Sequence, residues 1–487
     1  MCTVIPLSLS EIAAVTNGRL HGARGTEVVT AVEFDSRAIR PGGLFLALPG
    51  ERVDGHDFAA AAVERGAVAV LAAREVDGPA VVVPPVARVT GTYLGETDPD
   101  GAGAAVLAAL ARLAGHVVGE LSGLTVVGVT GSSGKTSTKD LLAAVLAPLG
   151  PTVAPPESFN NELGLPWTAL RADADTRHLV LEFSARGAGH IAALAAAVPP
   201  RIGVVLNVGS AHLGEFGSVD AIARAKGELV EALPSNGVAV LNADDPRVAA
   251  MASRTTARVR TFGARADVRA EDLTLDAGRA RFRLVTPAGS APVALRLVGG
   301  HHVGNALAAA AVAAELGGAP ETVAAALSAA APASRWRMEV TDRADGVTVV
   351  NDAYNANPDS MKAGLKALAW MAGEGAEKRR SWAVLGEMAE LGDDAISEHD
   401  RIGRLAVRLD VSRLIVVGTG RSMSAMHHGA VMEGSWGSES TMVADADAAL
   451  ALLRAELQAG DVVLVKASNA VGLGALADAL AAEDVPG

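Results

Sequence analysis

The sequence predicts an α/β protein of three domains built on mostly parallel sheets. Short runs of β-branched residues alternate almost throughout with alanine- and leucine-rich runs of helical length, which is typical of parallel sheets flanked by helices. The chain has 487 residues, and at roughly 100–200 residues per domain this length allows about three cores. Changes of composition predict domains at residues 1–98, 99–332 and 333–487.

Composition and charge exclude several classes of partner. Half of the residues are hydrophobic and the net charge is −13, so bulk charge does not favour nucleic acid or an anionic membrane surface. The single cysteine, Cys2, excludes an intramolecular disulfide and a cysteine metal site, and it fits a reducing compartment. The N-terminus shows no signal-peptide pattern, and no uninterrupted apolar run reaches about 18 residues. We expect a cytoplasmic monomer with no membrane insertion and no nucleic-acid partner.

The first domain is predicted to be a small α/β unit. β-branched and apolar runs predict strands at 43–48, 67–73 and 80–83, and an alanine-rich run predicts a helix at 57–66. The stretch 91–103 is rich in glycine and aspartate and lacks periodicity, so it predicts the first domain boundary.

The second domain is predicted to combine a parallel sheet with antiparallel strands. Its predicted buried strands, each followed by a loop and a helix, are 124–130, 178–184, 201–209 and 238–245. The segment 269–299 instead alternates apolar and polar residues between turns, which predicts antiparallel strands. A helix is predicted at 305–316.

The third domain returns to the pattern of a parallel sheet after residues 329–340. Its predicted strands, separated by helices, are 347–352, 382–387, 413–419 and 461–467.

The segment "GSSGKT" (131–136) predicts a phosphate-binding loop, because it follows a predicted strand and opens a helix with one apolar face. Its glycines would let backbone N–H groups turn toward phosphate at the positive end of the helix dipole. Lys135 would then reach the terminal phosphates, and the Thr136 hydroxyl would ligate Mg²⁺. The loop departs from the general G-x-x-x-x-G-K-[ST] pattern, since Val129 stands at the first glycine. The alternative is an ordinary glycine-rich turn.

An acidic and an imidazole side chain appear where predicted strands end. Glu182 lies at the end of one strand, and His212 follows the next. Ligands in open α/β sheets sit at the carboxyl ends of strands, so Thr136, Glu182 and His212 are candidates to hold Mg²⁺ against phosphate. The alternative for Glu182 is a solvated or capping residue, and for His212 it is a structural histidine.

Three further positions allow a structural and a functional interpretation. Lys226 lies in a predicted helix, where an exposed lysine is the default. Asp352, in "NDAYNANPDSM" (351–361), belongs either to a simple turn or to a site in which it accepts hydrogen bonds from a hydroxylated ligand. Arg335 and Arg337 precede it and would supply a cation to phosphate from a second domain, although surface arginines are common.

Five segments in this order resemble the Mur ligase family: "TGSSGKTS", "SFNNELGLPWTAL", "LNVGSAHLGEFGSVDAIARAKGEL", "GGHHVGNALAAAA" and "NDAYNANPDSM". The last is similar to the branch that joins D-alanyl-D-alanine to UDP-N-acetylmuramoyl-tripeptide. The "DNPR" element of the branch that adds the third residue is not found. The segment "FDSRAIRPGGLFLALPGERVDGHDF" also resembles the uridine-nucleotide end of this branch, so the similarity spans nearly the whole chain.

The resemblance implies a UDP-sugar-binding N-terminal domain, a central P-loop ATPase domain and a C-terminal Rossmann-like domain that closes over the site. It implies ATP and Mg²⁺ as cofactors, and UDP-N-acetylmuramoyl-tripeptide and D-alanyl-D-alanine as substrates. The tripeptide carboxylate would take the γ-phosphate of ATP and form an acyl phosphate. The amine of D-alanyl-D-alanine would then displace phosphate. Mg²⁺ and Lys135 would screen the anions that the reaction brings together.

The resemblance also assigns residues by motif position. The implied ATP contacts are Thr130, Gly131, Ser132, Ser133, Gly134, Lys135, Thr136, Ser137, Asn305 at the adenine, Arg337 at the phosphates and Asp352 at the ribose. The implied metal ligands are Thr136, Glu182 and His212. The implied catalytic residues are Lys135, His212 and Lys226, the last where the family has a lysine that can be carbamylated. The implied substrate contacts are Ser36, Arg37, Asn160, Asn161, Tyr354, Asn355 and Asn357.

Four positions depart from the usual pattern of the family. His302 stands where many relatives have asparagine, and Asn469 stands where an arginine is common. These two changes concern the adenine pocket and the C-terminal closing contact. Arg186 and His190 replace the more usual asparagine and glutamate beside Glu182.

Two alternative functions stay open at this stage. One is a Mur-type ligase with a different amino-acid donor, which the amine that stimulates ATP hydrolysis would identify. The other is a regulatory P-loop ATPase that changes conformation without making a bond, which ATP turnover without an acceptor would identify. Whether the third residue of the tripeptide is lysine or meso-diaminopimelate is not encoded in any motif above.

Overall fold

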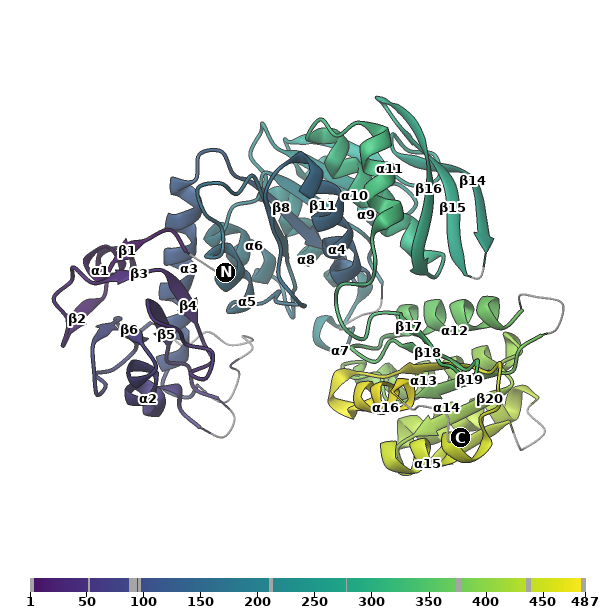
Figure 1. Ribbon diagram of the computed structural model, residues 1–487. Helices are drawn as coiled ribbons and strands as arrows, with labels where there is room; N and C mark the ends of the chain where they lie inside the picture. The colour runs from purple at the N-terminus through teal and green to yellow at the C-terminus, as the bar shows by residue number, and fades with distance from the viewer. Residues whose placement is uncertain are drawn as a thin grey trace.

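The computed structural model describes residues 4–50, 53–86, 94, 98–209, 213–276, 278–373, 378–434 and 439–482. These residues form three α/β parts, which Figure 1 shows from purple through teal to yellow. The N-terminal and C-terminal parts lie on different sides of the central part, and most strand pairs in the two largest sheets are parallel. The prediction of a three-part α/β fold is confirmed. The boundaries at residues 98 and 332 stay predictions.

The N-terminal part is built on a five-stranded sheet in which only the β2–β7 pair is antiparallel. Its strands, in sheet order, are β2 (Arg19–His21), β7 (Ala80–Val82), β6 (Ala67–Ala72), β5 (Gly43–Leu46) and β4 (Ala31–Glu33). Beside it lie β1 (Leu7–Ser8), β3 (Val28–Val29), α1 (Leu9–Thr16), η1 (Gly55–Phe58) and α2 (Ala59–Glu64). The three strands and the helix expected here are present within a few residues of their predicted ends.

The central part is built on a six-stranded, fully parallel sheet. Its strands, in sheet order, are β13 (Arg258–Phe262), β12 (Val238–Asn242), β11 (Ile202–Val205), β8 (Thr125–Thr130), β10 (His178–Glu182) and β9 (Thr152–Val153). The chain adds β9 and β10 on one side of β8 and β11 to β13 on the other. Ligands of open α/β sheets bind where the strand order reverses in this way, which is at the loop after β8.

Helices cover both faces of the central sheet. The helices of this part are α3 (Ala102–Glu120), α4 (Lys135–Leu146), α5 (Gly164–Ala169), α6 (His190–Ala197), α7 (Leu213–Phe216), α8 (Val219–Glu231), α9 (Pro246–Ala250), α10 (His301–Glu315) and α11 (Pro320–Ala329), with short turns η3 (Ala147–Leu149) and η4 (Met251–Arg254). On β8, Val127 and Val129 belong to the core with α4 and α10, whereas Val126 belongs to the core with α3. This alternation follows from the two-residue repeat of a strand.

Helix α3 joins the N-terminal and central parts. It is the one described helix with the length and apolar composition of a membrane span. Ten of its residues are buried inside the protein, and it packs against α1 and α5 in a core shared by the two parts. We interpret α3 as a core helix of the folded chain.

The antiparallel strands expected in 269–299 are β14 (Arg269–Asp276), β15 (Arg279–Thr286) and β16 (Gly289–Val298). Helix α10 follows them but begins four residues before its predicted start at 305. The turn that precedes it is Gly299–Gly300, and the φ of Gly299 is +116°, in the region that favours glycine. The turn therefore ends the strand and lets the helix start at once.

The C-terminal part is a six-stranded sheet in which only the β17–β18 pair is antiparallel. Its strands, in sheet order, are β17 (Glu339–Asp342), β18 (Thr348–Asn351), β22 (Val462–Lys466), β19 (Ser381–Leu385), β20 (Arg413–Val417) and β21 (Ser440–Val443). Its helices are α12 (Pro358–Gly373), α13 (Ala395–Arg408), α14 (Arg421–Glu433), α15 (Ala446–Glu456) and α16 (Leu473–Ala481), with turns η5 (Gly392–Asp394) and η6 (Asn469–Val471). The four predicted strands are confirmed.

An aromatic cluster ties the N-terminal part to the central part. The indole N–H of Trp167, on α5, donates to the carbonyl oxygen of Val32, on β4, at 2.9 Å. The rings of Phe34 and Phe159 pack against the indole with centroid separations of 5.5 and 4.9 Å. Trp167 and Val32 are both buried, so water would not readily replace the indole N–H as a donor to the Val32 carbonyl.

We expect Trp167→Phe to lower the free energy of unfolding by about 1–3 kcal/mol, because it removes this hydrogen bond while it keeps an aromatic ring. The measurement is the urea midpoint of the purified variant. Trp370→Phe serves as the control, since Trp370 is 39% exposed, and its effect should be within about 0.5 kcal/mol. Equal effects of the two substitutions would contradict the role given to Trp167.

Candidate active site

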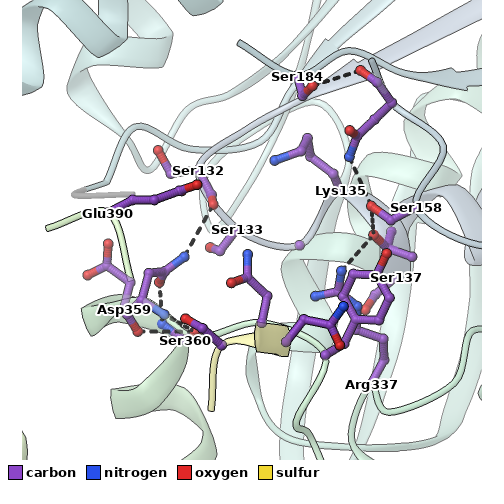
Figure 2. Close-up of a pocket in the computed structure, with 18 of the residues that line it drawn as sticks. Ser132, Ser133, Lys135, Ser137, Ser158, Ser184, Arg337, Asp359, Ser360 and Glu390 are labelled. Carbon is purple, nitrogen blue, oxygen red and sulfur yellow. Dashed lines mark hydrogen bonds between the residues drawn. The ribbon is translucent and has the colours of Figure 1, made fainter. Parts of the chain in front are cut away.

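A cavity of about 480 Å³ lies between the central and C-terminal parts. Its walls come from the loop after β8, the segments after β9 and β10, the start of α10, the residues before β17, and the ends of β18 and β22. In Figure 2, Arg337 and Ser158 lie on one side of it, and Asp359, Ser360 and Glu390 lie on the other. The switch point of the central sheet therefore opens onto the C-terminal part.

The loop after β8 has the geometry expected for binding phosphate. Gly134 precedes α4 with φ +82°, and a Cβ atom there would lie 2.7 Å from Asn305 Oδ1, so the position requires glycine on two counts. Lys135 opens the helix and donates to the Gly131 carbonyl at 2.8 Å. Burial lowers the pKa of the Lys135 amine, while the Glu182 carboxylate opposes this shift. This local contact holds the lysine near the loop.

The residues around Glu182 fit a hard divalent cation. The carboxylate is fully buried, and its Oε2 accepts from Thr136, Ser158 and Asn160 at 3.3 Å each. The two hydroxyl contacts are longer than the roughly 2.7–2.8 Å that hydroxyl donors prefer. The other oxygen, Oε1, is buried and has no hydrogen-bond partner among the described residues. Oxygen donors of this kind, including an orphaned carboxylate oxygen, are the ligands that Mg²⁺ prefers.

Two of the three predicted catalytic residues need comment. His212 lies outside the described residues. Lys226, on α8, is buried, so the default expectation of an exposed lysine is wrong. Burial lowers the pKa of its amine well below the usual value, and the nearby Lys135 adds to this shift. An apolar face of α8 packs against β11, and this packing, which no local pattern reveals, carries the lysine inward.

Arg337 brings a cation from the C-terminal side to the phosphate loop. Its Nη2 donates to the Thr136 hydroxyl at 3.2 Å, and its guanidinium lies 4.1 Å from the centroid of the Tyr354 ring. Its neighbours Trp336 and Met338 both have positive φ, +57° and +52°, which is uncommon for such side chains. Such strain persists where surrounding contacts hold it, and it clusters at functional sites.

Asp352 lines the cavity but is already held by two protein groups. Its Oδ2 pairs with Lys466 Nζ at 2.6 Å, and its Oδ1 accepts from the Met338 N–H at 3.1 Å. Lys466 also donates to the Asn355 carbonyl at 2.9 Å. The sequence prediction missed Lys466, although a lysine that ends a buried strand is itself an unusual pattern. Burial lowers the pKa of its amine, and Asp352 opposes that shift.

Several predicted substrate residues line the cavity and also stabilise the backbone that shapes it. Asn161 Oδ1 accepts from the Gly164 N–H at 2.9 Å at the start of α5. Asn357 Oδ1 accepts from the Ser360 N–H at 2.9 Å at the start of α12. The predicted contacts found in the lining are Asn160, Asn161, Tyr354, Asn355, Asn357, Ser132, Ser133, Gly134, Lys135, Thr136, Ser137, Asn305, Arg337 and Asp352.

Other predicted contacts lie elsewhere. The Thr130 hydroxyl is buried and donates to the Phe183 carbonyl at 2.8 Å, so it joins the end of β8 to the residue that follows β10. Gly131 contributes its carbonyl to Lys135. Ser36 and Arg37 follow β4 in the N-terminal part, outside the cavity lining, and the exposed Arg37 pairs with Asp35 at 2.9 Å.

Three of the four departures from the family pattern fall in the cavity wall. Arg186, His190 and Asn469 all line the cavity. His302 instead is buried beside Asn305, with 3.5 Å between His302 Nδ1 and Asn305 Nδ2, and its Nε2 has no hydrogen-bond partner among the described residues. It therefore contributes to the packing behind Asn305 rather than to the cavity wall.

Sequence reasoning missed a second group of lining residues. Five of them lie inside the quoted family segments but received no role there, namely Ser158, Asn207, His301, Asp359 and Ser360. The other three, Ser184, Glu390 and Lys466, lie outside those segments. Asn207 is the most informative of them. Its Oδ1 accepts from the Ser133 N–H at 3.0 Å, and its Nδ2 donates to the Ser133 carbonyl at 3.1 Å, which fixes the phosphate loop against the end of β11.

Family models match most of the chain. The Mur ligase middle domain matches residues 129–313, the Mur ligase glutamate ligase domain matches 336–469, and the Mur ligase family catalytic domain matches 28–118. A Mycobacterium tuberculosis (strain ATCC 25618 / H37Rv) protein is 63% identical over 507 residues, covering 99% of each chain. The chain belongs to the Mur ligase family. The family predicted from the motifs is thereby confirmed.

Other relatives and solved structures of the Mur ligase family agree. The Mycobacterium tuberculosis relative and an Escherichia coli (strain K12) relative are both named UDP-N-acetylmuramoyl-tripeptide--D-alanyl-D-alanine ligase. The latter is 36% identical over 85% of this chain and 86% of its own. A MurF structure from Acinetobacter baumannii matches with TM-score 0.84 and 30% identity, over 99% of this chain and 100% of that one. A MurF ligase structure from Thermotoga maritima in complex with ADP matches with TM-score 0.76 and 28% identity, over 93% and 97%.

We expect His302→Asn to reduce the loss of stability on acidification. Burial lowers the pKa of His302 well below its usual 6.5. Below pH 6.5, His302 of the unfolded chain therefore binds a proton that His302 of the folded chain does not bind. The folded state therefore loses stability as the pH falls below 6.5, by up to about 1.4 kcal/mol per pH unit for one such group. The measurement is the urea midpoint of both proteins from pH 7.5 to 5.5. The exposed His428 provides a control variant, His428→Asn, and equal pH slopes in all three proteins would contradict the expectation.

Proposed function

We propose that this chain joins D-alanyl-D-alanine to UDP-N-acetylmuramoyl-tripeptide with hydrolysis of ATP, which gives the UDP-muramoyl-pentapeptide of peptidoglycan synthesis. The meeting of the phosphate loop with Arg337 at Thr136 carries the proposal of ligase chemistry, because it completes a phosphate site with a cation from a second domain. The identity of the substrates rests on the names of relatives that match 99% of the chain.

The first step is transfer of the γ-phosphate of ATP to the tripeptide carboxylate. A carboxylate is a poor acyl donor, and the resulting acyl phosphate supplies a leaving group. Two anions must approach each other, so fixed positive charge lowers the barrier. We assign this role to Lys135 on the phosphate loop and to Arg337 on the opposite wall. Thr136, Ser158 and Glu182 would hold Mg²⁺, which would supply further positive charge at the phosphates.

The second step is attack of the D-alanyl-D-alanine amine on the acyl carbon, with phosphate as the leaving group. The acyl phosphate is open to hydrolysis while water reaches it, so the cavity between two domains protects the intermediate. Asn160 and Asn161 lie on the central wall, and Tyr354, Asn355 and Asn357 lie on the C-terminal wall. We assign them to the peptide substrates. We assign Asn305 and Asp352 to the nucleoside of ATP, and Ser36 and Arg37 to the UDP-sugar.

The assay that tests this function uses purified protein, ATP, Mg²⁺ and UDP-muramoyl-tripeptides with either lysine or meso-diaminopimelate at the third residue. Each is incubated with and without D-alanyl-D-alanine, and the product mass is measured. A pentapeptide product supports the proposal. Ligation of a different amine would favour another amino-acid donor, and rapid ATP hydrolysis without acceptor or covalent product would favour a regulatory ATPase. We propose a cytoplasmic location for this enzyme, and its monomeric state stays a prediction.

We further propose that Lys226 acts as a carbamate. The neutral amine is the form that reacts with CO₂, and burial lowers the pKa of Lys226 and so favours that form. We expect Lys226→Ala to lower the rate by about 10²-fold or more, because it removes the negative charge that a carbamate would supply for holding Mg²⁺. Lys226→Glu should recover little, because its carboxylate is two methylenes closer to the backbone than the lysine nitrogen. The steady-state rate is measured before and after CO₂ depletion and bicarbonate addition. Full activity of Lys226→Ala, or an unchanged wild-type rate on bicarbonate addition, would contradict the role. Lys378→Ala is the control, because Lys378 is half-exposed.

Arg337→Ala should lower kcat/KM for ATP by about 10²-fold or more, because it removes the only proposed cation from the C-terminal wall at the phosphates. Affinity for the UDP-tripeptide alone should stay nearly unchanged, since the N-terminal part is expected to bind the UDP group. Arg335→Ala is the matched control, because Arg335 is exposed and pairs with Asp478 instead. Phosphate release is measured with each substrate omitted in turn. Equal losses in the two variants would count against the site.

A further inference from the structure

The linker between the central and C-terminal parts, residues 330–338, is held from both sides. It begins after α11 ends at Ala329 and finishes where β17 begins at Glu339. Arg337 lies near its end and reaches the phosphate loop. The position of this guanidinium therefore depends on what holds the linker.

On the central side, a buried lysine holds the linker. Lys139 is 1% exposed and is among the largest fully buried side chains of the described residues. Its amine donates to the Ser334 hydroxyl at 3.1 Å and to the Pro155 carbonyl at 2.9 Å, and it pairs with Asp140. Asp140 Oδ2 also accepts from the Ser334 N–H at 3.2 Å. Two consecutive residues of α4 thus form hydrogen bonds with both the side chain and the backbone of Ser334.

On the C-terminal side, the linker residues Trp336 and Met338 are bonded to the C-terminal part. The indole N–H of Trp336 donates to Asp478, on α16, at 3.0 Å, and the Met338 N–H donates to Asp352. A Cβ atom on Gly474 would lie 2.6 Å from the Trp336 ring, so a glycine there lets the indole lie against α16. The linker therefore changes partner between Ser334 and Trp336.

Helix α4 carries both Lys139, which holds the linker, and Thr136, which accepts from Arg337. Lys139 follows Thr136 by three residues on α4, so the two side chains lie on one side of the helix, about 4.5 Å apart along its axis. Thr136 is the residue that Arg337 contacts. The anchor of the linker and the residue that accepts from Arg337 thus lie on one helix, which the phosphate loop directly precedes.

We propose that Lys139 is a positioning residue for phosphoryl transfer, which fixes Ser334 as the pivot of the linker and so sets where Arg337 meets the phosphates. Burial of a lysine costs free energy unless its hydrogen bonds are satisfied, and here the anchor satisfies three contacts at once. The proposal rests on the proposed ATP-dependent function, because Arg337 has a phosphate to contact only if the protein binds ATP.

A double-mutant cycle tests the proposal. Lys139→Met keeps the length of the side chain and removes its charge and hydrogen bonds, and it is combined with Arg337→Ala. We expect Lys139→Met alone to lower kcat/KM for ATP by about 10-fold or more, with affinity for the UDP-tripeptide within about twofold of wild type. In the Arg337→Ala background, Lys139→Met should have little further effect, because coupled residues are not additive.

Two control variants separate positioning from general destabilisation. Leu453→Ala, in the buried core of the C-terminal part, removes no hydrogen bond of the linker and should combine additively with Arg337→Ala. Lys378→Met removes a half-exposed lysine and should leave the rate unchanged. If Lys139→Met does not fold, Ser334→Ala replaces it in the cycle. Additive effects of Lys139→Met, or of Ser334→Ala, and Arg337→Ala would overturn the proposal.

The cycle remains informative if the proposed substrates are wrong. Failure of the proposed function would appear in the wild-type protein, as the absence of the pentapeptide product. Failure of the positioning role would appear only as additivity in the cycle, measured as ADP release under whichever conditions support wild-type turnover.

Discussion

The hydrogen bond from Arg337 to Thr136, at 3.2 Å, joins the two parts of the chain that form the site. The loop after β8 supplies backbone donors and Lys135, but it is open on one side. The C-terminal part supplies the missing wall through the linker and the ends of β18 and β22. An active site divided in this way is complete only when the two parts are in contact, which gives the domain arrangement a direct chemical consequence.

Three of the charged groups buried around that contact form hydrogen bonds with neighbouring side chains. Glu182 lies beneath Thr136, Lys466 holds Asp352, and Lys139 holds Ser334. Each buried ion costs solvation, and its hydrogen bonds offset that cost only when the geometry is maintained. These networks therefore favour one relative position of loop, linker and strand ends. Burial of these charges costs stability, and it places them beside the cavity where we propose that ATP reacts.

The N-terminal part is attached by different physics. It shares a hydrophobic core with α3 and the central sheet, and the aromatic cluster around Trp167 adds a buried hydrogen bond. The central and C-terminal parts meet through polar contacts that line a cavity, and also through a smaller apolar contact in which Val298 of β16 shares a core with Met371 of α12. Apolar burial is not directional, whereas hydrogen bonds between buried polar groups stabilise only one geometry. The two junctions therefore differ in how much of the contact is polar.

The sequence by itself determined the elements that depend on local pattern. Buried strands, the helices after them, the phosphate loop and the family motifs are all written in short segments, and a strand–loop–helix context suffices to identify them. Short edge strands such as β17 and β21 were missed, because they carry polar residues and take their shape from a neighbouring strand. Only the tertiary structure decided that Lys226, Lys139 and Lys466 are buried, because desolvation depends on residues distant in sequence. For the same reason, only packing could place Arg337 on the loop 201 residues before it.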